Sequence, residues 1–105
     1  MDNMARVHFR FTYKAFLKGT EEVLITDTAI IVKQAEGTFQ IPLRDIKQVS
    51  VCGKDSILVG YGTSNEQTFY HTIKAVNSVH VVKDKLLDLI KKNKVRFMPK
   101  SIGFN

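Results

Sequence analysis

The strongest constraint on the fold is an uninterrupted alternation of apolar and polar side chains over residues 5–16. The apolar set is Val7, Phe9, Phe11, Tyr13 and Ala15. The polar set is Arg6, His8, Arg10, Thr12 and Lys14. Successive side chains of a β-strand point to opposite faces of the sheet, so this period of two predicts one long strand with a single buried face. We therefore expect the aromatic side chains of this strand to belong to the core.

Six shorter apolar runs follow, each ended by a polar or glycine-containing turn. They cover residues 23–26, 29–33, 38–41, 46–52, 56–61 and 67–73. Short runs rich in β-branched residues and separated by turns predict antiparallel strands. Pro42 cannot donate a hydrogen bond to a strand ladder, so we expect the chain to leave its strand there and form a bend or a single helical turn over residues 43–45.

The hydrophobic period changes near residue 77. Apolar side chains then recur at spacings of three and four, at Val79, Val82, Leu86, Leu89 and Ile90. This stripe predicts an amphipathic helix over about residues 77–92, capped by Asn77 or Ser78 and ended near Asn93. Residues 94–98 are expected to form a further short strand or the start of a tail, and residues 99–105 an irregular tail.

The length of 105 residues leaves room for one domain. We predict a single α+β, mainly β domain over residues 1–98, with its strands between about residues 5 and 73. The expected architecture is a small antiparallel barrel or sandwich of six or seven strands with one C-terminal capping helix. A barrel of the oligonucleotide- and oligosaccharide-binding type is the alternative fold.

The formal net charge of +6 is concentrated near the C-terminus. The cationic side chains there are Lys83, Lys85, Lys91, Lys92, Lys94, Arg96 and Lys100. A cluster of this kind attracts an acidic protein surface, an anionic membrane or a nucleic acid. The alternative is that these lysines only complement the helix dipole and keep the protein soluble.

A second candidate binding surface is the polar face of the first predicted strand, with Arg6, Arg10 and Lys14. A nucleic-acid-binding sheet needs exposed aromatic side chains beside its cations, so that bases can stack on them. In this strand the aromatic residues alternate with the cations and occupy the opposite face. The pattern therefore favours recognition of a protein over recognition of nucleic acid.

The sequence predicts no catalytic residue, metal site or cofactor. The three histidines, His8, His71 and His80, have no metal-ligand spacing, and we expect the first two to be ordinary surface residues. Cys52 is expected to be a buried, inert thiol, and as a single cysteine it cannot form an internal disulfide framework. The scattered aspartates form no recognisable acid pair.

No apolar stretch approaches the length of a membrane-spanning helix, and the first residues lack the apolar run of a signal peptide. The expected location is therefore the cytoplasm.

Two segments carry a resemblance to a known superfold. Residues 22–32 read EVLITDTAIIV, and residues 37–46 read GTFQIPLRDI, with an I-P-L-x-x-I step. This arrangement resembles the pleckstrin-homology-like (PH-like) superfold, including its GRAM and bacterial relatives, over about residues 20–92. The resemblance implies a partly open barrel closed at one end by the helix. It also implies a non-catalytic adaptor function, in which a protein segment binds between the helix and a neighbouring strand with Lys83, Lys91 and Lys92 at the rim.

A narrower resemblance concerns the archaeal CheF taxis proteins, in their N-terminal part. The same L-I-T…I-P-L…I run occurs there, as does a basic V-x-F-x-P-x-x-I-G segment like residues 95–103. This resemblance implies an alternative function as an adaptor that joins chemotaxis proteins to the archaellum.

The first hairpin differs from that of phosphoinositide-binding PH domains. Those domains gather cations around this turn, whereas residues 18–22 here hold Glu21 and Glu22 beside Lys18. Arg10 and Lys14 at best balance the two glutamates. We therefore expect no specific binding of inositol phosphates, and only diffuse, salt-sensitive attraction to anionic lipid through residues 83–100.

Overall fold

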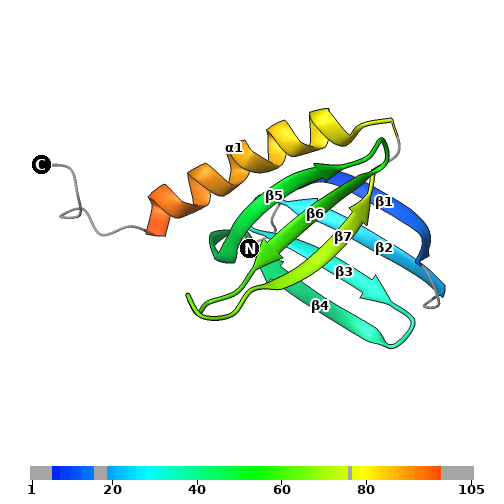
Figure 1. Cartoon of the computed structure of the whole chain (residues 1–105), viewed down its shortest axis with the longest axis horizontal. Coiled ribbons are helices and arrows are strands. Elements are labelled where there is room, and N and C mark those ends of the chain that lie inside the picture. The colour runs from blue at the N-terminus through cyan, green and yellow to red at the C-terminus, as the bar shows by residue number, and fades with distance from the viewer. Residues whose placement is uncertain (1–5, 16–18, 76, 98–105) are drawn as a thin grey trace, which may run out of the picture.

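The computed structural model describes residues 6–15, 19–75 and 77–97, and of residues 95–97 only the backbone. These residues form two antiparallel sheets and one long helix (Figure 1). The first sheet has the order β1 (Val7–Ala15), β2 (Gly19–Thr26), β3 (Ala29–Gln34) and β4 (Gly37–Pro42). The second has the order β5 (Ile46–Cys52), β6 (Ser56–Tyr61) and β7 (Phe69–Lys74), and α1 (Val79–Phe97) follows it. The predicted α+β, mainly β class is confirmed.

The link between the two sheets is the short helical turn expected after Pro42. Residues Leu43–Asp45 form one turn of 3₁₀-helix, η1. The Leu43 N–H donates to the Thr28 carbonyl oxygen at 2.9 Å, so this turn is held against the connection between β2 and β3. In the described residues no ladder of paired strands joins the two sheets, which makes the arrangement two packed sheets and not a closed barrel.

The second strand is longer than its apolar run predicted. It begins at Gly19 and not near residue 23, because Glu21 pairs in register with Tyr13 and Glu22 with Thr12. Both glutamates therefore belong to a strand of the first sheet. The expectation that they lie in the hairpin turn beside any bound phosphate is wrong.

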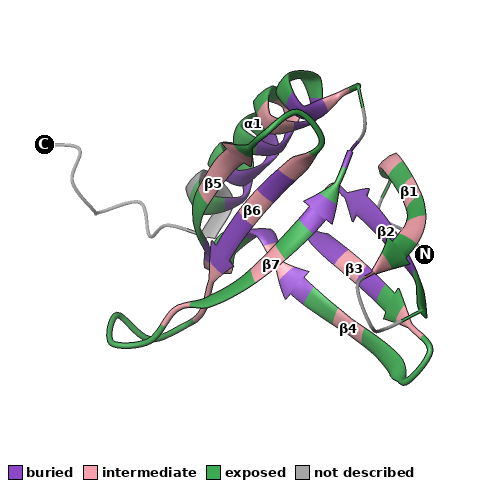
Figure 2. Ribbon diagram, turned by 45° about the vertical axis from the view of Figure 1, so that its right-hand side comes forward, coloured by how far each residue is buried: buried purple, intermediate pink, exposed green. Residues whose placement is uncertain are grey.

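The core lies between the facing sheets and under α1 (Figure 2). Phe9, Phe11 and Tyr13 are only partly buried and pack against this core from β1. Val7 departs from the expected alternation and is 46% exposed. The register of β1 against β2 shifts between Val7 and Phe9, and such a bulge re-aims side chains, so Val7 leaves the core face while the His8 side chain becomes largely buried.

The helix is longer than predicted. It runs from Val79 to Phe97, so Lys94 and the residues up to Phe97 are helical and do not form a strand. Asn93 does not end the helix because its side chain is buried and donates to the carbonyl oxygens of Leu89, at 2.8 Å, and Asp27, at 2.7 Å. The first residue of the helix lies close to the predicted start near residue 77. Helix α1 begins at Val79, directly after Ser78, and the Ser78 carbonyl oxygen accepts the Val82 N–H.

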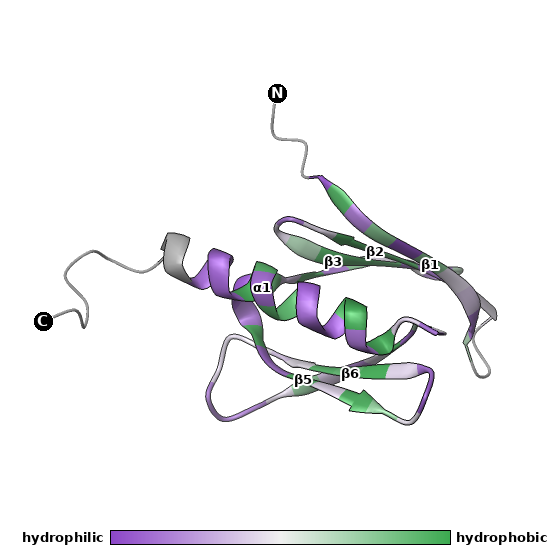
Figure 3. Cartoon of the chain, turned by 90° about the horizontal axis from the view of Figure 1, so that it is seen from above, coloured by the Kyte–Doolittle hydropathy of each residue, from purple (hydrophilic) through white to green (hydrophobic). Residues whose placement is uncertain are grey.

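The predicted helical stripe is the buried face of α1. Val79, Val82, Leu86, Leu89 and Ile90 are all at most 7% exposed. Seen from above, α1 lies over the space between the two sheets (Figure 3) and contacts η1, β5 and β6. Among the described helices, none combines the length and apolarity that crossing a membrane requires.

We predict that Leu86→Ala lowers the free energy of unfolding by about 2–5 kcal/mol, because it leaves a cavity at the centre of the buried stripe. Leu86 is 0% exposed, whereas the neighbouring Leu87 is 43% exposed. Leu87→Ala is therefore the matched control and should cost much less. Urea unfolding followed by circular dichroism measures both; equal midpoints for the two variants would show that α1 does not dock through this stripe.

Candidate functional site

The burial of one helix stripe determines where the lysines of α1 project. With about 100° of rotation per residue, Lys83, Leu87 and Lys94 lie on one flank of the buried stripe. Lys85 and Lys92 lie on the opposite flank. Two hollows of the surface confirm this division: Leu87 and Lys94 line one beside β5, and Lys85 and Lys92 line another beside the start of β1.

The first hollow, the β5–α1 groove, has a volume of about 180 Å³. It is lined by Ile46, Lys47, Gln48 and Val49 of β5 and by Leu87, Ile90 and Lys94 of α1. Strand β5 is at the edge of its sheet, paired in the described structure with β6 on one side. The groove thus combines an open strand edge with an exposed leucine and a lysine.

The Lys47 side chain binds the connection between β6 and β7. Its amino group donates to the carbonyl oxygens of Ser64 and Gln67, the latter at 2.9 Å, and to the Thr68 hydroxyl at 3.3 Å. These contacts hold the connection between β6 and β7 against β5. The cation that faces outward from the groove is therefore Lys94.

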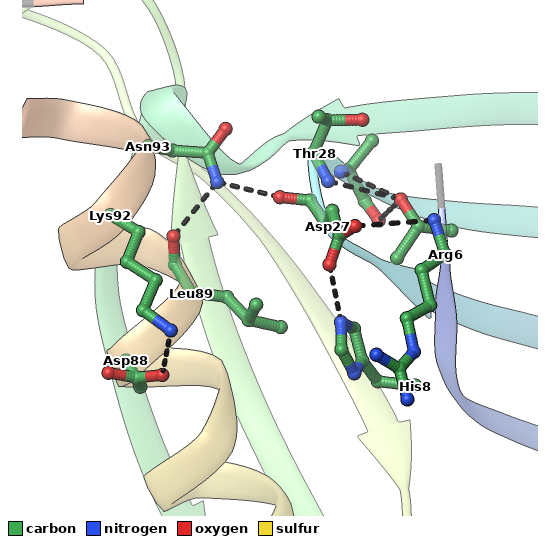
Figure 4. Close-up of polar contacts among 10 residues, drawn as sticks. Arg6, His8, Asp27, Thr28, Asp88, Leu89, Lys92 and Asn93 are labelled. Atoms are coloured by element: carbon green, nitrogen blue, oxygen red, sulfur yellow. Dashed lines mark hydrogen bonds and ion pairs between the residues drawn. The ribbon is translucent and has the colours of Figure 1, made fainter. Parts of the chain in front are cut away.

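The second hollow, the basic cleft, has a volume of about 300 Å³. It is lined by Arg6, His8, Asp27, Lys85, Leu89, Lys92 and Asn93. Figure 4 shows His8 of β1, the backbone of Arg6 and Asn93 of α1 around Asp27, which lies in the turn between β2 and β3, and Lys92 beside Asp88 on the helix. The predicted site residues Arg6 and Lys92, which are far apart in sequence, are brought together here.

Asp27 connects the three elements around the basic cleft. Its carboxylate accepts the Arg6 N–H at 3.3 Å and lies 2.5 Å from His8 Nε2. Its own N–H donates to the Arg6 carbonyl oxygen at 3.0 Å, and its carbonyl oxygen accepts Asn93 Nδ2 at 2.7 Å. The hydrogen bond from His8 lowers the pKa of Asp27, and the Arg6 N–H adds to this effect. Asp27 is therefore stabilised as an anion: each of its oxygens accepts a hydrogen bond within the protein, while its side chain is 44% exposed.

A buried carboxylate joins the two sheets at another place. Glu21 of β2 is 2% exposed and accepts hydrogen bonds from Tyr13 at 2.5 Å, Gln34 at 2.8 Å and His71 of β7 at 2.9 Å. Burial alone would raise the pKa of Glu21, but these three hydrogen bonds outweigh it and lower the pKa below its usual value. Burial, and after it the hydrogen bond to Glu21, raises the pKa of Tyr13.

A hollow of about 360 Å³ adjoins this cluster, between the edges of β1 and β7. It is lined by Tyr13, Ala15, Glu21, Tyr70, His71, Thr72 and Lys74. The carboxylate that lines this hollow, Glu21, already accepts hydrogen bonds from within the protein at both of its oxygens. The arrangement serves to attach β7 to the first sheet.

The predicted site residues are divided among several surfaces. Lys94 lines the β5–α1 groove, and the helical rotation places Lys83 on the same side of α1 although it lines neither hollow. Lys92 lies across the helix in the basic cleft with Arg6. Lys91 is exposed and, in the described structure, lines neither hollow. Contrary to the prediction from the sequence, Lys83, Lys91 and Lys92 therefore do not lie together at the rim of one groove.

The other predicted cations lie elsewhere. Arg10 on β1 forms an ion pair with Glu22 at 3.5 Å, and Lys14 is exposed on the same strand. The backbone of Arg96 is helical, and its side chain is outside the described residues.

Sequence reasoning misjudged three further side chains. His8 and His71 are not surface residues: their side chains are 14% and 16% exposed, and each contacts its own carboxylate. Their partners, Asp27 and Glu21, lie 19 and 50 residues away in sequence, so no local spacing could reveal them. Cys52 is exposed at the end of β5 and not buried as expected.

Among the described side chains, no three or more His, Cys, Asp or Glu residues converge on a point that could hold a metal ion. Comparisons of the chain with protein-family models, curated proteins and solved structures gave no match.

The contacts of Glu21 allow us to predict how the free energy of unfolding changes at acidic pH. Because the folded state holds the pKa of Glu21 below its usual value of 4.5, the ionised carboxylate stabilises the fold above that pH. This stabilisation is lost as the pH falls through the lower, folded-state pKa. Glu21→Gln should therefore flatten the loss of stability on acidification and, at pH 7, lower the free energy of unfolding by about 1–3 kcal/mol.

Glu22→Gln is the control, since the Glu22 side chain is 31% exposed and forms ion pairs with Arg10, at 3.5 Å, and Lys33, at 3.8 Å. It should cost less than about 1 kcal/mol at pH 7. Denaturant unfolding at a series of pH values measures both variants. The same pH profile for Glu21→Gln and the native chain would show that Glu21 is not held as an anion.

Proposed function

We propose that this chain is a non-catalytic recognition domain of the PH-like type that binds an acidic protein segment in the β5–α1 groove. The support from the fold is the arrangement of a four-stranded and a three-stranded antiparallel sheet followed by one helix packed over the space between them. This is the layout that the resemblance of residues 22–46 implies.

The observation that carries the proposal is an apolar side chain left exposed beside an open strand edge. Leu87 is 43% exposed although its neighbours on α1, Leu86 and Leu89, are buried. An extended peptide that pairs with an edge strand gains main-chain hydrogen bonds, and it places alternate side chains into adjoining pockets. A peptide paired with β5 would cover Leu87 and the part of Ile90 that lines the groove.

The charge of the flank indicates the chemistry of the partner. Lys94 lines the groove, and Lys83 projects from the same side of α1 about three helical turns earlier. Cations beside an apolar contact increase the rate of association with an acidic partner and disfavour a basic one. The preferred segment is therefore extended, apolar at one or two positions, and acidic around them.

Nucleic-acid recognition has weaker support. The aromatic side chains of β1 pack against the core, so the exposed face of β1 with Arg10 and Lys14 lacks an aromatic residue of its own strand on which a base could stack. Arg10 is also paired with Glu22. An adaptor role of the kind that the resemblance to archaeal CheF proteins implies would use the same protein-binding groove.

The groove is tested by placing a charge at its apolar centre. Leu87→Asp should abolish capture of the native partner from a lysate of the source organism, because it opposes an acidic segment and removes the apolar contact. Val81→Asp is the matched control, since Val81 is also apolar, helical and exposed, at 64%, but lies outside the groove. Quantitative mass spectrometry should show at least a tenfold loss for Leu87→Asp alone; an equal profile for both variants would exclude the groove.

The steering charges make a separate kinetic prediction. Lys83→Glu/Lys94→Glu should slow association with the captured partner about tenfold at low salt, and the difference should shrink as salt screens the charges. Lys85→Glu/Lys92→Glu makes the same change in net charge on the opposite flank and serves as the control. Surface plasmon resonance measures both. Equal rates for the two double variants would mean that only net charge, and not the groove flank, attracts the partner.

A further inference from the structure

We propose that the basic cleft on the other flank of α1 is a binding site for a single phosphate group. The site uses Arg6, which directly precedes β1, and Lys85 and Lys92 from the helix. It is separate from the β5–α1 groove, because the two hollows share no lining residue and lie on opposite sides of the buried stripe.

The walls of the cleft are fixed relative to each other by buried polar contacts. Asn93, 4% exposed, donates from α1 to the carbonyl oxygen of Asp27 in the turn between β2 and β3. That turn is held in place by Thr26, whose hydroxyl accepts the N–H groups of Thr28, at 3.2 Å, and Ala29, at 3.1 Å. The backbone of Arg6 is bonded to Asp27 in both directions. The cations therefore project from a framework that exists before a ligand binds.

The charge balance of the cleft favours an anion. Among the described side chains that line or contact it, the basic ones besides His8 are Arg6, Lys85 and Lys92, and the carboxylates are Asp27 and Asp88. Both oxygens of Asp27 are already engaged, by His8 and the Arg6 N–H (Figure 4). Asp88 pairs with Lys92 at 3.1 Å, but both side chains are about half exposed or more, at 48% and 63%. An exposed ion pair between residues four apart on a helix contributes little free energy, so the Lys92 amino group can leave Asp88 and bind a ligand oxygen instead.

The size and the donor set identify the ligand class. A volume of about 300 Å³ is at the small end for ligand sites and suits one compact group, not a chain of phosphates. The Arg6 guanidinium offers a planar set of donors that matches two oxygens of a tetrahedral oxyanion, and two lysines add point charges from the opposite wall. Three donors around one group fit the three terminal oxygens of a phosphate monoester better than the two oxygens of a carboxylate.

The test titrates the full chain with inorganic phosphate at constant ionic strength, using ¹H–¹⁵N correlation spectra. Saturable shifts are expected for the Arg6 and His8 amides and for the Asn93 side-chain amide. Lys85→Gln should weaken the phosphate affinity about tenfold, because it removes one charge-assisted contact. Lys91→Gln removes the same charge from the same helix outside the cleft and should leave the affinity within about twofold.

Two further arms separate the sources of the phosphate group. Methyl phosphate represents a soluble monoester, and vesicles with phosphatidic acid represent a lipid headgroup, compared with vesicles of equal charge made with phosphatidylglycerol. Saturable binding of either monoester that is lost in Arg6→Gln supports the site and names its source. No saturation by inorganic or methyl phosphate well above millimolar concentration, together with equal binding to both kinds of vesicle, would overturn it. Equal weakening by Lys85→Gln and Lys91→Gln would also overturn it, because the attraction would then be a property of net charge.

Discussion

The packing of α1 over the space between the sheets is the constraint on which the rest of the surface depends. Val82 and Leu86 are fully buried, and their burial fixes the rotation of the helix about its axis. Once that rotation is fixed, every other helical side chain has an assigned direction, since each residue is turned by about 100° from the last. Lys94 consequently lies beside β5, with Lys83 on the same side of the helix, and Lys85 and Lys92 lie on the side of β1. Lysines that cluster along one segment of the sequence are thereby divided between the two sides of the helix.

Because the two sheets share no ladder in the described structure, side chains have to connect them, and buried polar residues do part of this work. Glu21 joins β2 to β7 through His71, and Asp27 joins the first sheet to α1 through Asn93. In the part of the chain that the structure describes, no buried side-chain polar atom is left without a partner, so neither cluster carries the cost of an unsatisfied group. Each cluster also sets the shape of a hollow beside it: the Glu21 carboxylate is closed off by its own donors, whereas the Asp27 cluster leaves three cations facing a cleft.

The features that could be predicted from the sequence are those that depend on local periodicity. Alternation predicted β1, the shorter apolar runs predicted the other strands, and spacings of three and four predicted the stripe from Val79 to Ile90. The errors occurred where a distant partner changed the outcome. Asn93 is a common helix terminator, yet the carbonyl oxygen of Asp27, 66 residues away, holds it inside the helix. Glu21 looked like a loop residue because a carboxylate is rarely buried, and only the convergence of Tyr13, Gln34 and His71 makes its burial possible.

The same distinction explains why charge clustering in the sequence located the candidate cations but not the sites. The net charge of a segment does not say which way its side chains point. A binding site, in contrast, needs cationic side chains that point toward the same place from rigid elements. Arg6 and Lys92 line one cleft because Asp27 bonds the backbone of Arg6 with its carboxylate and Asn93 of the helix with its carbonyl oxygen. Lys91, adjacent to Lys92 in sequence, lines neither hollow in the described structure. The rotation of the helix therefore gives adjacent lysines of equal charge different surroundings, and comparing variants of the two distinguishes a local site from attraction by net charge.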